Sequence, residues 1–444
     1  MNIQEKTRLI QAAQAVLHHN WRGSFTRPTE HLYPHQWNWD SGFISLGYIQ
    51  NEPEKAFQEL FSLMKGQWEH GMIPHIVFAD DPHESYFPGP EFWECEQCTA
   101  SPDCSVVSGI TQPPVHGGIL NLLLELAPDS EEALTAAASL YDSIFRSHQY
   151  FYQYRDPNHE GLAYIRHPWE SGTDNSNAWD DAIARFDPSV VEMPAYRRKD
   201  NIVGKAAHRP TDLDYDYYIY LVDLFRKARY EEEIVDARSP FKIQDPLFNA
   251  VLSWSNAGMI TVAEKLGKST AQWKEWLDLT NHGLRSKLWD LERATFNSFD
   301  LVAEEVIQLE TNSGLIPLLS GCLSEEEAER VHQRILSPKF FGTSDQPAWL
   351  CPTLALDHPQ LNIEKYWRGP VWINTNWLLY LGCQAYGFSE TASRIRMDSL
   401  TLLKEFGFQE YFLPWKTLPE GIEPHLGAGK FSWSAALCIH WLTT

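Results

Sequence analysis

Two segments far apart in the chain each place a carboxylate among aromatic and small polar residues rather than among lysines or arginines. Residues 170–176 read Glu-Ser-Gly-Thr-Asp-Asn-Ser and contain Asp174, and residues 407–412 read Gly-Phe-Gln-Glu-Tyr-Phe and contain Glu410. Such surroundings prepare two acids for different protonation states, one as a proton donor and one as an ionised base. Two carboxylates with different roles are typical of a glycosidase.

Local sequence leaves other interpretations of these acids open. The run Thr-Asp-Asn-Ser at residues 173–176 favours a turn or a helix N-cap without any catalysis. Glu420 and Glu423 follow Glu410 in the same segment and compete with it, although their surroundings are typical of exposed loop carboxylates. The roles of these acids therefore depend on what surrounds them.

Residues 31–43 combine flat aromatic side chains with fixed polar groups. Trp37 and Trp39 flank an asparagine, and Asp40 follows directly. A sugar ring has apolar C–H faces and a rim of hydroxyls, so this combination predicts sugar binding. The alternative is that Asp40 caps the helix that follows while the tryptophans fill the core.

A second aromatic segment spans residues 366–377. A Gly-Pro pair breaks any helix there and leaves Trp367 and Trp372 on a turn, where both are predicted to contact the sugar. Trp377 falls in the apolar stripe of the next helix, and we interpret it as packing. Three Pro/Gly loops between the two aromatic segments each present one polar side chain that we expect at the site, namely His75, Tyr86 and Gln112.

The elements that must position these residues are helices, because the apolar spacing is mostly helical and strand-like alternation is scarce. The predicted class is all-α, and residues 1–444 are expected to form a single domain because no long Gly/Ser linker divides them. Segments rich in aromatic residues fall between the helices, with long loop insertions expected at 71–112 and 161–211. Helices are predicted at 2–19, 53–67, 115–126, 130–152, 212–228, 246–266, 270–288, 304–319, 325–336, 368–386, 389–405 and 431–442.

The composition limits the partners. The 444 residues carry a formal net charge of −23, which repels polyanions, so we expect neither nucleic acid nor an acidic membrane surface as a partner. The mean hydropathy is −0.37, and no apolar run approaches the roughly 20 residues of a membrane-spanning helix. The start of the chain mixes charges with isolated apolar residues and lacks the apolar core of a secretory signal, which predicts a cytoplasmic location.

Cys95, Cys98 and Cys104 resemble three of the four ligands of a structural zinc site. His83 or His116 would have to supply the fourth ligand, and neither stands at a spacing typical of such sites. Reduced thiols in an irregular loop are therefore the preferred interpretation. We expect no metal and no cofactor, because acid/base cleavage of a glycoside requires none.

The chain contains Gln-Trp-Asn-Trp-Asp at residues 36–40, the acidic segment at 170–176, Tyr-Trp-Arg-Gly-Pro-Val-Trp at 366–372 and Phe-Ser-Trp-Ser-Ala-Ala at 431–436. Together and in this order, these motifs resemble glycoside hydrolase family 63, most closely its compact bacterial mannosylglycerate and glucosylglycerate hydrolases. The resemblance implies an (α/α)6 barrel, inverting α-glycosidase chemistry, Asp174 as general acid and Glu410 as general base. Trehalases and larger processing glucosidases share the barrel, so the clan is better defined than the substrate.

Arg209 is a rare cation in acidic surroundings. An arginine fork matches a carboxylate in two parallel hydrogen bonds, so we expect Arg209 to hold the carboxylate of a leaving group such as glycerate. The alternative is a structural ion pair with Asp212 or Asp214, in which case a neutral disaccharide fits better. Tyrosine hydroxyls are expected to satisfy the remaining lone pairs of the carboxylate, and the resemblance implies the same set, namely Tyr33, Tyr86, Tyr215 and Tyr366.

The predicted function is inverting hydrolysis of a small glycosylated carboxylic acid, with 2-O-α-glucosylglycerate slightly preferred over the mannosyl analogue. The alternative enzyme is an α-glucosidase or a trehalase that acts on a neutral disaccharide. Two further alternatives are a sugar-binding protein without activity, which the presence of both carboxylates disfavours, and an epimerase, which the scattered histidines disfavour. The sequence leaves the oligomeric state open, a homo-oligomer included.

Overall fold

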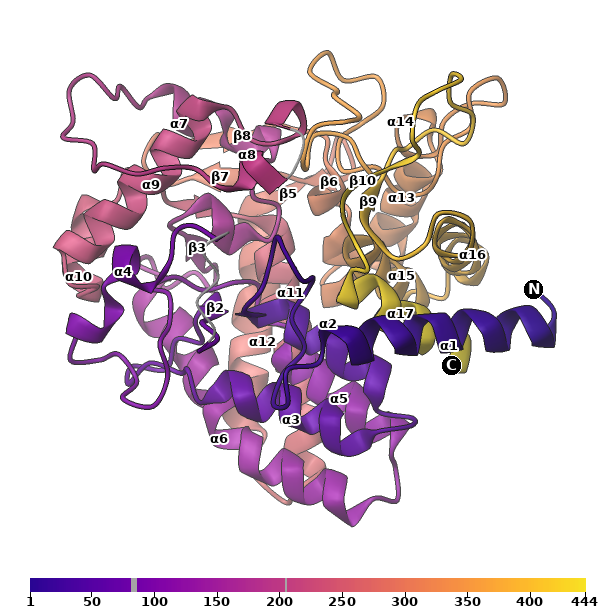
Figure 1. Cartoon of the computed structure of the whole chain (residues 1–444), viewed down its shortest axis with the longest axis horizontal. Helices are drawn as coiled ribbons and strands as arrows, with labels where there is room; N and C mark the ends of the chain where they lie inside the picture. Colours follow the sequence, from indigo (N-terminus) through magenta and orange to yellow (C-terminus); the bar gives the residue numbers. More distant parts are fainter. Residues whose placement is uncertain (81–85, 204–205) are drawn as a thin grey trace.

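The computed structural model describes residues 1–80, 86–203 and 206–444, and within them the chain is mostly helical (Figure 1). No helix in these three ranges is long and apolar enough to cross a membrane. The helices of eleven residues or more are α1 (Ile3–Asn20), α2 (Asn38–Tyr48), α3 (Pro53–Met64), α5 (His116–Leu126), α6 (Glu131–Tyr154), α9 (Asp212–Lys227), α11 (Pro246–Lys265), α12 (Ala271–Gly283), α13 (Glu325–Ile335), α15 (Ile373–Ala385), α16 (Ser389–Phe406) and α17 (Ser432–Thr443).

Short helices and strands connect these long helices. The short helices are α4 (Pro90–Trp93), α7 (Asp180–Ala184), α8 (Asp200–Val203), α10 (Glu232–Arg238) and α14 (Pro338–Phe341). The strands are β1 (Gln36–Trp37), β2 (Ile76–Val77), β3 (Tyr164–Ile165), β4 (Ile243–Gln244), β5 (Trp289–Asp290), β6 (Thr295–Phe296), β7 (Ser298–Asp300), β8 (Glu305–Ile307), β9 (Gln409–Phe412) and β10 (His425–Gly429).

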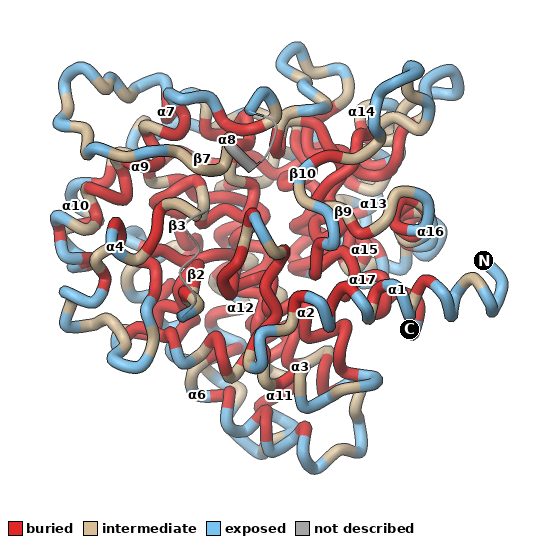
Figure 2. Tube along the Cα trace, in the orientation of Figure 1, coloured by how far each residue is buried: buried red, intermediate tan, exposed pale blue. Residues whose placement is uncertain are grey.

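The core lies among helices that are apolar on nearly every side. α2 and α17 bury almost all of their residues, and they pack against each other, with α17 also contacting α1, α15 and α16. A helix that is hydrophobic all round belongs in the interior of a large domain. α11 packs in turn against α5 and α12. Exposed residues are concentrated in the peripheral loops and on the outer faces of the surrounding helices (Figure 2).

All strand pairs are antiparallel, and they fix the loops rather than build a layer. β1 pairs with β2, which ties the segment before α2 to the loop after α3. β9 pairs with β10, and β3, β4, β7 and β8 form a four-stranded sheet. Segments from both of the long loop insertions are therefore held by strand pairs whose partners lie elsewhere in the chain.

Two helix predictions are wrong. Residues 304–319 form 3-10 turns and β8, which pairs with β7, instead of a helix, and Pro317 has no N–H for a helical hydrogen bond near the end of the segment. The segment up to residue 43 is predicted as a binding loop, but α2 begins within it at Asn38. All residues of α2 are buried, so it shows no polar face and no helical alternation of apolar and polar residues. The other predicted helices are confirmed, although α15 begins at Ile373 rather than at 368.

Candidate active site

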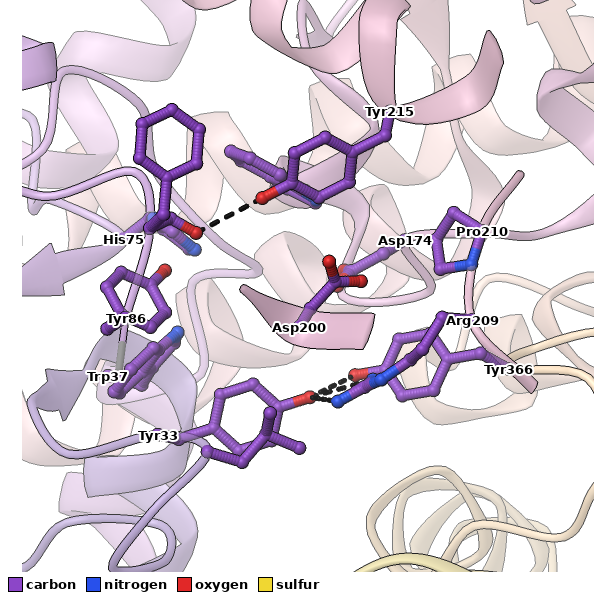
Figure 3. A pocket seen from close by; sticks show the side chains of 13 residues that line it. Tyr33, Trp37, His75, Tyr86, Asp174, Asp200, Arg209, Pro210, Tyr215 and Tyr366 are labelled. Atoms are coloured by element: carbon purple, nitrogen blue, oxygen red, sulfur yellow. Dashed lines mark hydrogen bonds between the residues drawn. The ribbon is translucent and has the colours of Figure 1, made fainter. Parts of the chain in front are cut away.

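The loops between the helices enclose two adjoining cavities. We call the cavity lined by Glu410 the inner cavity and the cavity lined by Arg209 the outer cavity. Asp174 and Arg209 line the outer cavity (Figure 3). Asp174 also lines the inner cavity, together with Glu410. The predicted acid, base and anion-binding residue therefore lie around one continuous space. The residues that line both cavities are Tyr33, Trp37, His75, Asp174 and Tyr366.

Asp174 follows a 3-10 turn and Gly172. Gly172 has a φ of +73°, and a Cβ there would lie 2.5 Å from the ring of Trp39, so only glycine fits. The carbonyl of Asp174 accepts a hydrogen bond from the Tyr218 hydroxyl at 3.0 Å. Burial raises the pKa of the Asp174 carboxyl to about 7, and the charge of Glu410 adds to this rise. A carboxyl group with this pKa can still carry its proton near neutral pH.

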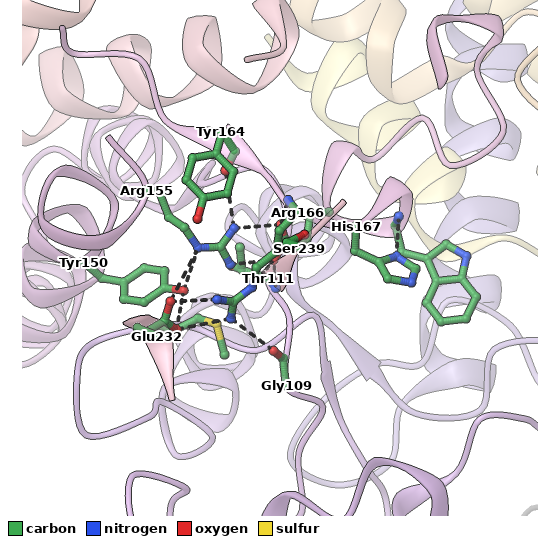
Figure 4. Close-up of polar contacts among 12 residues, drawn as sticks. Gly109, Thr111, Tyr150, Arg155, Tyr164, Arg166, His167, Glu232 and Ser239 are labelled. Carbon is green, nitrogen blue, oxygen red and sulfur yellow. Dashed lines mark hydrogen bonds and ion pairs between the residues drawn. The ribbon is translucent and has the colours of Figure 1, made fainter. Parts of the chain in front are cut away.

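A buried ion-pair network includes Arg155, Arg166 and Glu232 (Figure 4). It extends to Glu170, which lies in the segment that carries Asp174. Glu170 accepts hydrogen bonds from the two terminal nitrogens of Arg155 at 2.7 and 2.9 Å. Burial opposes ionisation of Glu170, but the charge of Arg155 outweighs it and lowers the pKa of Glu170 to about 2. Glu170 also accepts the backbone N–H of Thr111 at 3.1 Å, next to the cavity-lining Gln112. The same carboxylate thus fixes two of the cavity-lining loops.

Glu410 lies on β9 and is fully buried. Its Oε1 accepts hydrogen bonds from the hydroxyls of Tyr33 at 2.9 Å and Tyr366 at 3.2 Å, and its Oε2 accepts the backbone N–H of Ala428 on β10 at 2.9 Å. A Cβ on Gly427 would lie 2.3 Å from Oε2, so this approach of β10 requires glycine. Burial raises the pKa of Glu410, whereas the three donors favour its ionised form.

Asp40 is a third carboxyl group at the inner cavity. Burial raises its pKa well above the usual value, and the charges of Glu410 and Asp174 add to the rise. A protonated Asp40 can donate a hydrogen bond to a sugar hydroxyl. The expected alternative, that Asp40 caps the following helix, is wrong, because Asp40 lies inside the first turn of α2 and the N-cap residue is Trp37.

Arg209 is a buried cation at the outer cavity, with only 6% of its surface exposed. Its Nη1 and Nη2 both donate to the Tyr33 hydroxyl at 3.2 Å, and its guanidinium lies 4.7 Å from the centre of the Tyr366 ring. Among the described residues, no carboxylate oxygen comes within 4.0 Å of its guanidinium. Arg209 therefore has no direct ion-pair partner there, and the charge of Glu410 acts on it across the Tyr33 hydroxyl.

The expected alternative partners of Arg209 have other contacts. Asp212 pairs with Arg198 at 2.9 Å. Asp214 accepts the backbone N–H of Thr211 at 2.7 Å in the capping box of α9. The structural ion pair considered from the sequence is therefore not formed among the described residues.

The remaining predicted site residues, with one exception, also line the cavities. Tyr86 and Tyr215 line the outer cavity, and the Tyr215 hydroxyl donates to the carbonyl of Phe87 at 3.2 Å. Burial lowers the pKa of His75 to about 3, so its ring is neutral near pH 7. The inner cavity is lined by Trp37, Trp39, Gln112 and Trp367.

Trp372 is the exception. It is fully buried and lines neither cavity. Its ring stacks on Trp367 with centroids 3.6 Å apart, and on its other neighbour Tyr411 at 4.7 Å. The turn therefore presents Trp367 to the inner cavity and uses Trp372 to support it. Trp377 is buried within α15, as predicted.

Sequence reasoning missed several lining residues. Asp200 lines the outer cavity and receives two hydrogen bonds from Arg198, Nε to Oδ1 at 3.0 Å and Nη2 to Oδ2 at 2.9 Å (Figure 3). Its place in the run Arg-Arg-Lys-Asp at 197–200 is typical of a solvated loop, so composition hides it. Phe431 and Trp433, at the start of α17, line the inner cavity. Both belong to the motif at residues 431–436, and this motif was the feature of the sequence from which they could have been predicted.

The three-cysteine loop contains free thiols. Cys95 is buried and Cys104 is exposed, and the described residues contain no group of three or more potential metal ligands. His116 lies buried at the start of α5. His83, the other fourth ligand considered, lies outside the described residues.

Comparison with known proteins agrees with this geometry. Residues 33–434 match the model of the mannosylglycerate hydrolase MGH1-like glycoside hydrolase domain. The mannosylglycerate hydrolase of Thermus thermophilus is 40% identical over 97% of this chain and 99% of that protein. The glucosylglycerate hydrolase of Mycolicibacterium hassiacum is 32% identical over 98% of each.

Solved structures show the same relationship. A family 63 mannosylglycerate hydrolase from Thermus thermophilus, in complex with Tris and D-glycerate, aligns with a TM-score of 0.89 at 38% identity, covering 98% of this chain and 99% of that one. Neutral trehalase from Saccharomyces cerevisiae aligns with a TM-score of 0.56 at 13% identity over 94% of this chain and 73% of that one, a likeness of fold alone. The predicted resemblance to glycoside hydrolase family 63 is confirmed, and the chain belongs to the family of MGH1-like glycoside hydrolases.

Proposed function

We propose that this chain is an inverting α-glycosidase that hydrolyses 2-O-α-glycosylglycerates to the sugar and glycerate. The observation that carries the proposal is the buried Arg209, which has no carboxylate within ion-pair distance in the described part of the chain and lines the cavity next to Asp174. A buried cation is costly unless an anion compensates it, so a ligand carboxylate fits this position. The hydroxyl of Tyr33 and the ring of Tyr366, which both contact Arg209, complete this anion-binding site.

The two acids have the properties that the reaction requires. Asp174, with a pKa of about 7, gives its proton to the glycosidic oxygen as the bond to the sugar breaks. Glu410, whose ionised form three hydrogen-bond donors favour, takes a proton from the water that attacks the opposite face of the sugar. Inversion requires room for this water, which corresponds to about 6.5–9.5 Å between the carboxyl groups.

Each cavity would bind one part of the substrate. The inner cavity, with its tryptophan walls and Asp40, suits a hexose, and the outer cavity with Arg209 suits a small acid. Asp174 lines both and would lie at the bond between the two parts. A neutral disaccharide, the alternative substrate, would leave Arg209 without an anion.

Glucose and mannose, which are epimers, are both candidates for the sugar of the substrate. The sequence slightly favours the glucosyl compound. The relative named for mannosylglycerate is more similar to this chain, at 40% identity, than the relative named for glucosylglycerate, at 32%. The two sugars differ at a single hydroxyl. The proposal therefore includes both substrates, with glycerate as the common leaving group.

We also propose that residues 1–444 form one (α/α)6-barrel domain. Twelve helices of eleven residues or more in the described ranges, a buried interior shared by elements from both ends of the chain, and the trehalase-like fold support this. The reaction as proposed uses only side chains, water and substrate, so it calls for no cofactor.

Substitution tests the two catalytic roles. Asp174→Asn and Glu410→Gln should each lower kcat by at least about 100-fold, since each removes one proton transfer. The exposed Asp181→Asn and Glu420→Gln make the same chemical change outside the cavities and should keep wild-type kcat. Rates are measured by glycerate release, and folding by circular dichroism. A Glu410→Gln enzyme with near-wild-type kcat would remove Glu410 from the mechanism.

The pH profile tests the acid role of Asp174. The proton donor must be protonated, so kcat/KM should fall as the pH rises through about 7. The charge of Arg209 lowers the pKa of Asp174, so Arg209→Ala should move this alkaline limb to higher pH. The profile is measured with a neutral aryl α-glycoside, which does not need Arg209 for binding. An alkaline limb that stays in place in Arg209→Ala would contradict the coupling.

Product analysis tests the reaction and its stereochemistry. The enzyme should release glycerate from both 2-O-α-glucosylglycerate and 2-O-α-mannosylglycerate, and proton NMR at early times should show the β-anomer of the free sugar first. Trehalose serves as the neutral control and should be hydrolysed far more slowly. Faster hydrolysis of trehalose, or the α-anomer as first product, would contradict the proposal.

A further inference from the structure

The hydroxyl groups of Tyr33 and Tyr366 belong both to the surroundings of the candidate base and to the candidate anion-binding site at Arg209. Glu410 Oε1, the Tyr33 hydroxyl and the Tyr366 hydroxyl form a triangle with sides of 2.9, 3.2 and 3.1 Å. Both terminal nitrogens of Arg209 donate to the Tyr33 oxygen at 3.2 Å (Figure 3). A continuous set of contacts therefore leads from the cation at the outer cavity to the carboxylate at the inner one.

The triangle has fewer protons than contacts. Each phenol carries one proton and an ionised Glu410 carries none, so at most two of the three oxygen contacts are hydrogen bonds at the same time. When both hydroxyls donate to Oε1, the two lone pairs of that oxygen are occupied. In this state Oε1 cannot hold the attacking water. The arrangement can change by rotation of a single hydroxyl.

A carboxylate at Arg209 would change how these protons are shared. It would accept N–H groups from Arg209 and, as a charged acceptor, would compete with Glu410 for the hydroxyl protons of Tyr33 and Tyr366. Each proton that turns to the ligand frees one lone pair of Oε1. The negative charge of the ligand also offsets the positive charge of Arg209, which otherwise stabilises ionised Glu410 and weakens it as a base.

We propose that the carboxylate of the leaving group activates the base, because its binding at Arg209 draws the hydroxyls of Tyr33 and Tyr366 away from Glu410. The inference rests on the proposed function and adds a role to the same site. Tyr33 and Tyr366 are positioning residues that act through Glu410. The enzyme would then prefer acidic substrates in kcat as well as in KM, because a neutral leaving group leaves Oε1 of Glu410 occupied.

A merely structural role for the two tyrosines leads to a different expectation. If they only hold Glu410 in place, filling the outer cavity with a free carboxylate should leave the rate of a neutral substrate unchanged or should inhibit it. The two roles therefore differ in the effect of a carboxylate that is not part of the substrate.

An α-glycosyl fluoride is the suitable substrate, because its leaving group is one atom and leaves the outer cavity open. Fluoride also departs with little help from an acid, so the rate reports mainly on the base. Hydrolysis of α-glucosyl and α-mannosyl fluoride is followed with a fluoride electrode while D-glycerate, acetate or glycerol is added. D-glycerate should raise kcat saturably by about tenfold, acetate should do so less, and neutral glycerol should have no effect.

Variants identify the route of the effect. Arg209→Ala should abolish the response to D-glycerate, whereas Arg285→Ala, which breaks only an exposed pair with Glu327, should retain it. The double variant Tyr33→Phe/Tyr366→Phe should hydrolyse the fluoride faster than wild type without D-glycerate and should gain little from it, because Oε1 is free from the start. Loss of the response together with an unaltered or lower basal rate in this double variant would overturn the role of the hydroxyls.

The outcomes separate the inference from the proposed function. Hydrolysis of a glycosyl fluoride that D-glycerate only inhibits, or leaves unchanged, would overturn the activation and leave the α-glycosidase assignment intact. Failure to hydrolyse either fluoride, with or without D-glycerate, would overturn the assignment and the inference with it. Hydrolysis that requires D-glycerate would support both.

Discussion

The site depends on one buried cation that has no direct ion-pair partner. Arg209 lies buried between Tyr33 and Tyr366, and within the described residues no carboxylate comes within 4.0 Å of it. Removing a cation from water costs several kcal/mol in rough terms, and phenol oxygens and aromatic faces offset only part of this. An anionic ligand would supply the rest. The outer cavity is therefore better suited to an acid than to a neutral sugar, and the enzyme can gain selectivity from a charge that its own fold leaves unpaired.

The rest of the fold holds that charge beside two acids. The Arg155–Glu170 pair holds the loop of Asp174, and the β9–β10 pair holds Glu410. Both places require glycine, Gly172 against a tryptophan ring and Gly427 against the carboxylate itself. Loops between helices can thus place three buried ionisable groups around one space, where their charges shift one another's pKa values. Because Arg209 and Glu410 lie close together, both contact the Tyr33 hydroxyl, which connects anion binding to the candidate base.

Asp174, Glu410 and Arg209 were singled out in the sequence as charged residues in unusual surroundings, and the roles proposed for the two acids come from the resemblance to family 63. The helices could be found because most have one apolar face. α2 could not, since burial on all sides removes the alternation that identifies a helix. Trp372 could not be told from Trp367, because a turn places neighbouring rings on different faces only in three dimensions. The place of Asp200 depends on how a long loop folds over the cavity, which local composition does not determine.

The most direct test is a comparison of kcat/KM for 2-O-α-glycosylglycerate and for the glyceramide with the same sugar, an analogue of nearly the same size without the negative charge. If the buried Arg209 binds the substrate carboxylate, kcat/KM should be about 100-fold higher for the acid than for the amide, and Arg209→Ala should remove most of this difference. Equal kcat/KM values for acid and amide in the wild-type enzyme would contradict the central claim that the substrate supplies the missing anion.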